Sequence, residues 1–135
     1  MGLDVGDRRI GVAVSDELGI GAYGVVVIER SDPVSDLAKI QNLVGEYEAG
    51  RIIVGFPRMM NGTVGIQGEK VLKFVETLQQ SVTVPVTLWD ERLSTRAAEQ
   101  VLLEANMRRS GRKKVIDRLA AAMILQNYLD SLLRT

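Results

Sequence analysis

The feature that most constrains the fold is a short apolar run, residues 51–54, that lies between two segments of helical periodicity. A nearly continuous apolar run of this length is typical of a strand buried on both faces of a parallel sheet. The helix before it begins at Asp32-Pro33 and ends at Gly50, with apolar positions at Leu37, Ile40, Val44 and Tyr47. We expect Gly55 to end the strand. This alternation of helix and buried strand predicts an α/β domain.

Three further strands precede that helix. Apolar, β-branched segments at Gly2–Val5, Ile10–Val14 and Val25–Ile28 are separated by glycine-containing turns. Short segments joined in this way favour a meander of neighbouring strands. The sheet is therefore predicted to mix an antiparallel part with a parallel part.

Helices and one more strand follow the buried run. After Asn61-Gly62 we predict a helix with its apolar side formed by Val71, Phe74, Val75 and Leu78. Val84–Trp89 predicts the last strand, Ser94 caps the next helix, and a final helix extends from about Lys114 to Leu133. The whole order predicts a mixed five-stranded sheet with helices on both faces.

The amino-acid composition limits which side chains can take part in catalysis or metal binding. The 135 residues include no His and no Cys, which excludes imidazole and thiolate metal ligands, Ser-His catalysis and disulfides. The length suffices for one core, so we expect a single domain over residues 1–135. No apolar run approaches the ~18 residues of a membrane span and no leader opens the chain, so we expect a cytoplasmic protein. Because the first strand starts at Met1 and is short, we also expect a few residues upstream.

Basic residues are concentrated in residues 107–118. Six Lys and Arg residues there stand against one acid, so this segment carries +5 and the rest of the chain −5. Such a cluster is either a solvated loop or a strip that binds phosphates. We predict a loop before the final helix, whose nucleic-acid contacts are Arg108, Arg109, Arg112, Lys113 and Lys114.

Acidic residues occur at the ends of the first and last strands. Asp4 lies in the apolar first strand just before Gly6, where an acid either forms a turn or needs a partner. Asp90-Glu91 lies at the carboxyl end of the last strand, where open α/β sheets bind ligands, unless it pairs with Arg92. Neighbouring strand residues face opposite sides, so we expect one of the two to face the site that contains Asp4.

Asp117 is the most informative acid. Its neighbours at helical spacing form an apolar stripe that we expect to face the sheet, made of Ala120, Ala121, Ile124 and Tyr128. The two alanines allow the helix to approach the sheet closely and bring the carboxylate toward the strand ends. The alternative is an acid stabilised by the dipole at the start of a helix.

Carboxylates that crowd one site repel one another unless a cation compensates. Oxygen ligands without His or Cys match Mg²⁺ or Mn²⁺. Two such ions about 3.5 to 4 Å apart can activate a water and stabilise the leaving oxygen at a phosphodiester. The three acidic positions therefore predict a site for two divalent ions, and the basic segment would hold the nucleic acid.

Four segments of the chain resemble the YqgF family, whose members are also called RuvX. They are DVGDRRIGVA at residues 4–13, IVGFP at 53–57 with NGT at 61–63, DERLST at 90–95, and ID at 116–117 with AA at 120–121 and IL at 124–125. Members are bacterial RNase H-like proteins described as Holliday junction resolvases and as nucleases that mature the precursor of small-subunit ribosomal RNA. The four motifs stand in the family's order over nearly the whole chain.

The resemblance implies an RNase H-like fold and a metal-dependent phosphodiesterase. It places the family's catalytic and metal-binding acids on Asp4, Glu91 and Asp117. It also implies that the site is bordered by Gly6, Gly55, Pro57, Asn61, Gly62 and Thr63. We add Arg8 and Arg58 to the predicted nucleic-acid contacts.

The leading prediction is a nuclease that acts on structured nucleic acid, most of all on precursor ribosomal RNA. A four-way DNA junction is the alternative substrate, and its resolution would require two active sites, hence a homodimer in which Leu119 and Met123 form either interface or core. A nucleotide phosphotransferase of the actin or sugar-kinase type shares the Asp-x-Gly turn, but it closes two domains around the nucleotide. A non-catalytic RNA-binding assembly factor that uses only the basic segment is a further alternative.

Overall fold

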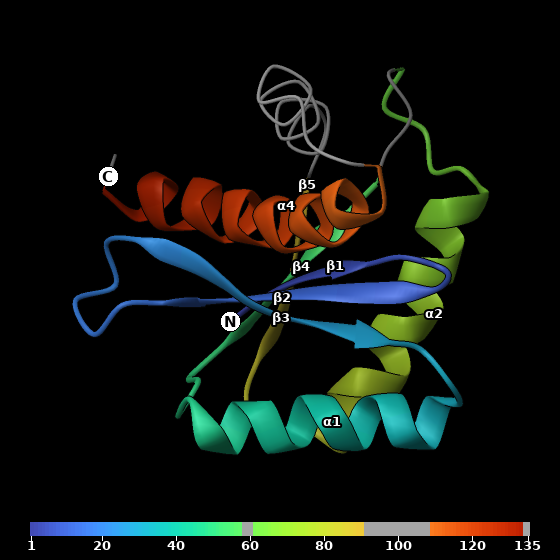
Figure 1. Ribbon diagram of the computed structural model, residues 1–135, viewed down its shortest axis with the longest axis horizontal. Helices are drawn as coiled ribbons and strands as arrows, with labels where there is room; N and C mark the ends of the chain where they lie inside the picture. Colours follow the sequence, from blue (N-terminus) through green and yellow to red (C-terminus); the bar gives the residue numbers. More distant parts are fainter. Residues whose placement is uncertain (58–60, 91–108, 134–135) are drawn as a thin grey trace.

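The computed structural model describes the backbone of residues 1–57, 61–90 and 109–133, and their side chains except those of 109–114. Its strands are β1 (Gly2–Val5), β2 (Arg9–Ser15), β3 (Ala22–Glu29), β4 (Ile52–Phe56) and β5 (Val86–Asp90). Its helices are α1 (Pro33–Glu46), α2 (Ile66–Ser81) and α4 (Arg109–Leu132), shown in Figure 1. The predicted helix after Ser94 lies outside the described residues.

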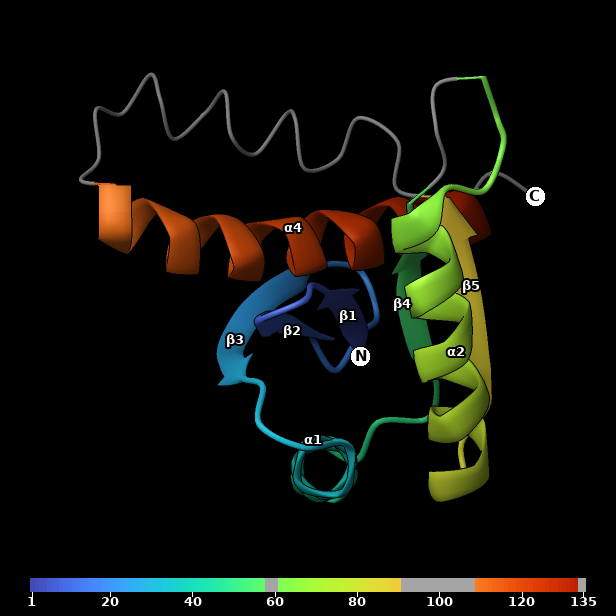
Figure 2. The same ribbon diagram turned by 90° about the vertical axis from the view of Figure 1, so that its right-hand side faces the viewer.

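The five strands form one sheet in the order β3-β2-β1-β4-β5. The meander β1-β2-β3 is antiparallel, whereas β4 runs parallel to β1 and β5 parallel to β4. Helix α4 covers one face of this sheet, and α1 lies across the other (Figure 2). The prediction of a mixed five-stranded sheet with helices on both faces is therefore confirmed.

The two faces of the sheet have separate cores. The larger one joins the sheet to α1 and α2 through big aliphatic and aromatic side chains, including Leu3, Ile10, Ile40, Ile52, Phe56 and Leu78. The smaller one joins the sheet to α4 through Ala13, Ile53, Ala121, Ala122, Ile124 and Leu125. Successive strand residues alternate between the two cores, as the pleat of a strand requires.

Strand β4 is buried along its whole length, as its apolar sequence predicts. The prediction that Gly55 ends this strand is wrong. Gly55 and Phe56 continue the parallel ladder, where they pair with Trp89 and Asp90 of β5. A glycine in a strand interior weakens it only modestly, and pairing with a partner strand offsets that cost.

Other boundaries also differ from the prediction. Helix α1 ends at Glu46 rather than at Gly50, with Tyr47 as its C-cap. Strand β5 begins at Val86 rather than Val84, because Pro85 has no N–H to donate to the ladder. Helix α4 begins at Arg109 rather than near Lys114, so most of the basic segment is helix and not loop. Arg and Lys are good helix formers, and the single Gly111 costs only about 1 kcal/mol.

The start of α1 follows the predicted signal. Pro33 occupies the first turn, and Oδ1 of Asp32 accepts a hydrogen bond of 2.9 Å from the backbone N–H of Ser35. This bond lowers the pKa of the Asp32 carboxyl below its usual value of 3.8.

Over the described ranges, no helix combines the length and apolarity needed to cross a membrane.

Candidate active site

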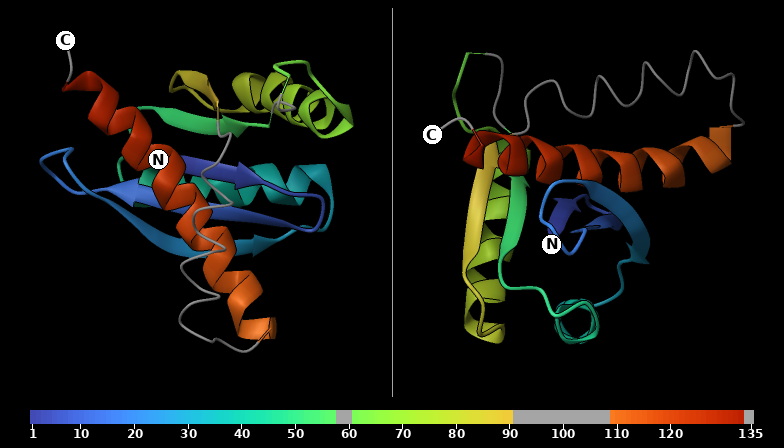
Figure 3. Two further views of the ribbon diagram at one scale, coloured as in Figure 1. Left: turned by 90° about the horizontal axis from the view of Figure 1, so that it is seen from above. Right: turned by 90° about the vertical axis from the view of Figure 1, so that its left-hand side faces the viewer.

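Helix α4 lies very close to the sheet because three strand residues beneath it are glycines. A Cβ at Gly11 would lie 2.0 Å from the backbone oxygen of Asp117, a distance that no side chain can occupy. At Gly2 and Gly24 the nearest α4 atoms would lie 2.8 and 2.7 Å from the added Cβ. Figure 3 shows the helix crossing obliquely over the strands of the sheet. The close contact depends on backbone meeting backbone.

The helix contributes small residues of its own to this contact. Ala120 and Ala121 are fully buried, as is Ile124, so the predicted apolar stripe does face the sheet. The prediction that two alanines permit close approach is confirmed. The matching signal on the strands, a glycine at positions 2, 11 and 24, was available in the sequence but was not recognised.

Asp4 and Asp117 are brought to the same face of the sheet. Asp4 lies directly opposite Gly11 in the β1–β2 ladder, and opposed residues of two strands point to the same face. Gly11 in turn lies beneath the backbone of Asp117. The side chain of Asp4 therefore faces α4, and Asp4 and the backbone of Asp117 both neighbour Gly11. Asp4 is half-buried.

Arg9 pairs with Asp117 across the contact between strand and helix. Its Nε donates a 2.7 Å hydrogen bond to Oδ2 of Asp117, and the two side chains are 27% and 23% exposed. This bond, more than the charge itself, raises the pKa of the Arg9 guanidinium above its usual value. Sequence analysis missed the pair, although alternation along β2 already places Arg9 on the same face as Gly11.

The end of β5 lies at the same edge of the sheet as the end of β4. Trp89 faces α4, where its ring meets Tyr128 edge-to-face at a centroid distance of 5.5 Å. Asp90 follows it, in register with Phe56. By the alternation of a strand, Asp90 lies on the face opposite to that of Trp89. The other member of the predicted pair, Glu91, lies outside the described residues.

The turn after Asp4 connects the site to the rest of the sheet. The N–H of Gly6 donates to the carbonyl of Arg9 at 2.9 Å, and this bond closes the hairpin between β1 and β2. A Cβ at Gly6 would lie 2.9 Å from that same carbonyl oxygen. Arg8 is exposed at the tip of the turn. Gly6 therefore lies in a tight turn directly after β1, and its place at the border of the site stays a prediction.

The loop between β4 and α2 contributes a second turn. Oδ1 of Asn61 accepts hydrogen bonds from the backbone N–H of Thr63 at 3.1 Å and from its hydroxyl at 2.7 Å, around Gly62 with a φ of +86°. Pro57 is half-buried at the end of β4. Arg58 lies outside the described residues.

The basic residues of the predicted strip fall into two groups. Arg109, Arg112, Lys113 and Lys114 belong to the first turns of α4. Arg108 lies outside the described residues. The basic residues of these first turns and Asp117 therefore belong to one continuous helix.

The donor set of the site consists of carboxylate oxygens. Within the part of the chain that the structure describes, no group of three or more acids is placed to hold a metal ion. Asp4 and Asp117 nevertheless share one face, and Glu91, the third predicted ligand, is not among the described residues. Two carboxylates on one face fit a hard cation such as Mg²⁺ or Mn²⁺ in the chemistry of their oxygens.

The family model described as "RuvX: Holliday junction resolvase" matches residues 1–131. The chain belongs to the RuvX family. Curated relatives named "Putative pre-16S rRNA nuclease" include a Desulforamulus reducens protein, 55% identical over 131 residues (97% of this chain and 96% of the relative), and a Clostridium novyi protein, 51% identical over 132 residues (98% of each). The resemblance inferred from the four motifs is confirmed, and with it the class of enzyme, a hydrolytic nuclease.

Solved structures with the same fold are resolvases. T. thermophilus RuvC in complex with a Holliday junction substrate matches with a TM-score of 0.60 at 18% identity, over 99% of this chain and 94% of that one. The Fowlpox virus resolvase with Holliday junction DNA matches with a TM-score of 0.55 at 12% identity, over 98% and 97% of the two chains. At these identities the likeness shows the fold alone, and it confirms the predicted RNase H-like architecture.

Proposed function

We propose that this RuvX-family protein hydrolyses phosphodiester bonds in the precursor of small-subunit ribosomal RNA, with the help of a divalent metal ion. The observation that carries the proposal is the shared face of Asp4 and Asp117: Asp4 pairs with Gly11, and the backbone of Asp117 in α4 lies over Gly11. The names of the relatives at 51% and 55% identity support ribosomal RNA as the substrate.

Asp4, Asp117 and Glu91 are the proposed catalytic residues and metal ligands. Arg9 engages Oδ2 of Asp117, which fixes the orientation of the carboxylate and leaves Oδ1 as a donor. Asp4 lies on the same face of the sheet in β1, so two separate elements would supply the first two ligands. A bound Mg²⁺ or Mn²⁺, as one or two ions, supplies stabilisation of the negative charge that develops at the phosphorus centre.

Basic residues at the start of α4 are the proposed contacts to the phosphates of the substrate. Arg109, Arg112, Lys113 and Lys114 precede Asp117 on one helix, so a strand bound there leads toward the acids. Arg8 stands exposed on the turn that follows Asp4. Binding through several phosphates depends steeply on salt. We place Arg58 and Arg108 in the same role.

A four-way DNA junction is the second candidate substrate, because the family model carries the description of a Holliday junction resolvase. Paired incisions would require two copies of the chain. Leu119 and Met123 are half-buried in the single chain and retain surface for such a contact. Light scattering of the protein alone and with a junction measures whether a dimer forms.

The test offers a labelled precursor ribosomal RNA fragment and a four-way DNA junction in parallel, with Mg²⁺, Mn²⁺ or EDTA. We expect metal-dependent products from the RNA with the wild-type protein and none with Asp4→Asn. Products from the junction alone would replace RNA by DNA as the substrate. Salt-sensitive binding without any product would favour an RNA-binding assembly factor.

We further propose that residues 1–135 act as a single domain in the cytoplasm.

A further inference from the structure

A cavity of about 300 Å³ opens between the sheet, α1 and α2, on the face opposite α4. Its apolar wall is formed by Val5, Leu37 and Phe74. Its polar rim carries three cations, Arg30, Lys70 and Lys73, and one acid, Asp7. A cavity with an apolar wall and a net positive rim is suited to a ligand that has a flat apolar part and an anionic group.

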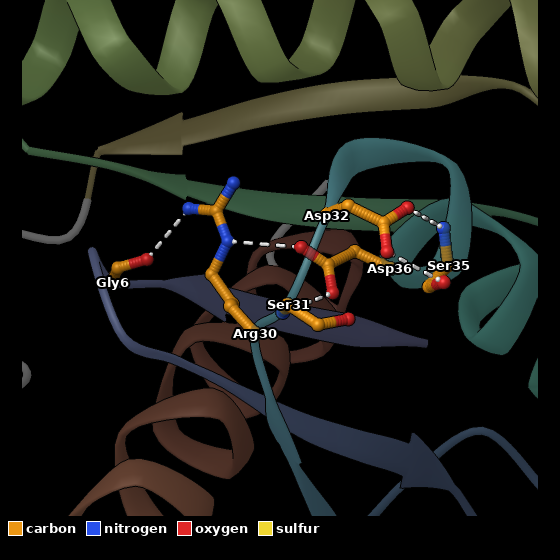
Figure 4. Close-up of polar contacts among 6 residues, drawn as sticks. All are labelled: Gly6, Arg30, Ser31, Asp32, Ser35 and Asp36. Carbon is orange, nitrogen blue, oxygen red and sulfur yellow. Dashed lines mark hydrogen bonds and ion pairs between the residues drawn. The ribbon is translucent and has the colours of Figure 1, made fainter.

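Arg30 is held rigidly at this cavity (Figure 4). Its Nε lies 3.4 Å from Oδ2 of Asp36, and its Nη1 donates a 2.8 Å hydrogen bond to the carbonyl of Gly6. The guanidinium carbon lies 5.4 Å from the centre of the Phe74 ring. Asp36 is itself only 1% exposed and accepts a 3.0 Å hydrogen bond from the backbone N–H of Ser31.

These contacts leave one donor group of Arg30 uncommitted. Its second terminal nitrogen, Nη2, has no hydrogen bond to any residue that the structure describes, and the side chain is 26% exposed. An arginine already fixed by an acid, a carbonyl and an aromatic ring loses little entropy when it binds an anion. The planar guanidinium suits a phosphate group in particular.

The two lysines add charge from the neighbouring helix. Lys70 pairs with Asp7 at 3.2 Å, but both side chains are more than half exposed, and such a pair is weak. Lys73 lies one helical turn further along α2 and forms no ion pair within the described ranges. Both amines therefore remain available to an anion at the rim.

We propose that this cavity binds a nucleotide, with its phosphate at Arg30, Lys70 and Lys73 and its base against the wall of Val5, Leu37 and Phe74. The phosphate supplies the anionic group that suits the cationic rim, and the base supplies the flat apolar part that suits the wall. The nucleotide is either free or one unit of a nucleic-acid strand, and the second source rests on the proposed nuclease function.

The cavity lies close to the candidate active site, although on the other face of β1. Asp7 follows Asp4 by three residues, so their Cα atoms are at most about 11 Å apart. Phosphates along one strand of a duplex advance by about 3.4 Å each along the helix axis. A strand that passes the carboxyl end of β1 can thus reach both places within a few nucleotides. Arg30 also holds the Gly6 carbonyl, in the turn that follows Asp4.

The test is an NMR titration of the metal-free protein with adenosine 5′-monophosphate, with adenosine and inorganic phosphate as separate probes. We expect the monophosphate to shift the backbone resonances of Asp7, Lys70 and Lys73, and each half-molecule to bind more weakly. Lys73→Gln should raise the Kd about threefold and the Lys70→Gln/Lys73→Gln variant about tenfold. Lys39→Gln, a charge change on the side of α1 that lines a separate hollow with β3, is the matched control and should leave the Kd unchanged.

A short RNA tetranucleotide under the same conditions identifies the source. A strand that threads past both sites binds more tightly than the monophosphate and also shifts resonances near Asp117, whereas a site for free nucleotides prefers the monophosphate. The proposal is overturned if neither the monophosphate nor the tetranucleotide shifts the α2 resonances, or if the lysine variants bind as the wild type does. Nucleotide binding without RNA cleavage would overturn only the proposed nuclease function. RNA cleavage without these resonance shifts would overturn only the proposal that the cavity binds a nucleotide.

Discussion

The two faces of the sheet are built in opposite ways. On the face of α1 and α2, large side chains such as Leu3, Ile40 and Leu78 fill the space between sheet and helices. On the face of α4, glycines and alanines let backbone meet backbone, and a half-buried ion pair takes the place of apolar volume. The first arrangement maximises buried apolar area. The second places charged groups from β1, β2 and α4 on one face. Such a face buries less apolar area, but it carries the groups that a catalytic site needs.

The α4 face should tolerate added volume least. Gly11→Ala places a methyl group 2.0 Å from the backbone oxygen of Asp117, and a backbone atom cannot move aside as a side chain can. We expect a loss of more than about 4 kcal/mol in the free energy of unfolding, beyond the usual cost of overpacking. Denaturant unfolding measures it. Gly45→Ala, in open space on α1, is the control and should be neutral or slightly stabilising.

The opposite face should tolerate lost volume least. Leu3 is fully buried among the side chains of the large core, so Leu3→Ala leaves a cavity. We expect a loss of about 3 kcal/mol by denaturant unfolding, with nuclease activity per folded molecule unchanged. If Leu3→Ala cost less than about 1 kcal/mol, the contrast between the two faces would be unfounded.

Arg9→Gln separates the structural from the electrostatic role of the α4 face. The ion pair is partly exposed, so its loss should change the free energy of unfolding by less than about 1 kcal/mol. Removing a cation 2.7 Å from an Asp117 oxygen should at the same time tighten Mn²⁺ binding, by about threefold or more. Calorimetric titration with Mn²⁺ measures the affinity, with Arg8→Gln as the control. Weaker binding in Arg9→Gln would show that the orienting effect of Arg9 on Asp117 outweighs the repulsion between its charge and the metal.

The smallest effect is expected at the exposed start of α1. Because hydrogen bonds from Ser35 lower the pKa of Asp32 in the folded state, its carboxylate stabilises the fold above the usual carboxyl pKa. That contribution is lost as the pH falls below about 4. Asp32→Ala should therefore lower the Tm slightly at neutral pH and by less in acid. Asp32→Ser keeps an acceptor without the titrating charge, so its Tm deficit should be smaller and less dependent on pH.

The fold was largely predictable from the sequence, because its signals are local. The apolar run of β4, the Pro33 helix start and the Ala120-Ala121 stripe each depend on a few neighbouring residues. Boundaries were less predictable where pairing decides them: Gly55 stays in a strand because Trp89 pairs with it. The basic residues of α4 were assigned to a loop, because charge alone does not distinguish a loop from a helix.

The site was predictable in its acids but not in its surroundings. Asp4 and Asp117 stood out because acids are unexpected among apolar neighbours. Arg9 did not, because its partner is 108 residues away in the sequence. The cavity could not be predicted for the same reason: Arg30 and Lys73 look like ordinary surface residues, and Phe74 like any residue on the apolar side of a helix, until the segment after β3 packs against α2.

The most direct test of the account is whether Asp4 and Asp117 bind one metal together. Mn²⁺ broadens the NMR signals of nearby nuclei, so substoichiometric Mn²⁺ can be added while backbone resonances of β1 and α4 are followed. We predict that the resonances around Asp4 and Asp117 broaden in parallel, and that Asp4→Asn removes the broadening at both. Broadening at only one of them, or at Asp117 undiminished in Asp4→Asn, would contradict a shared metal site beneath α4.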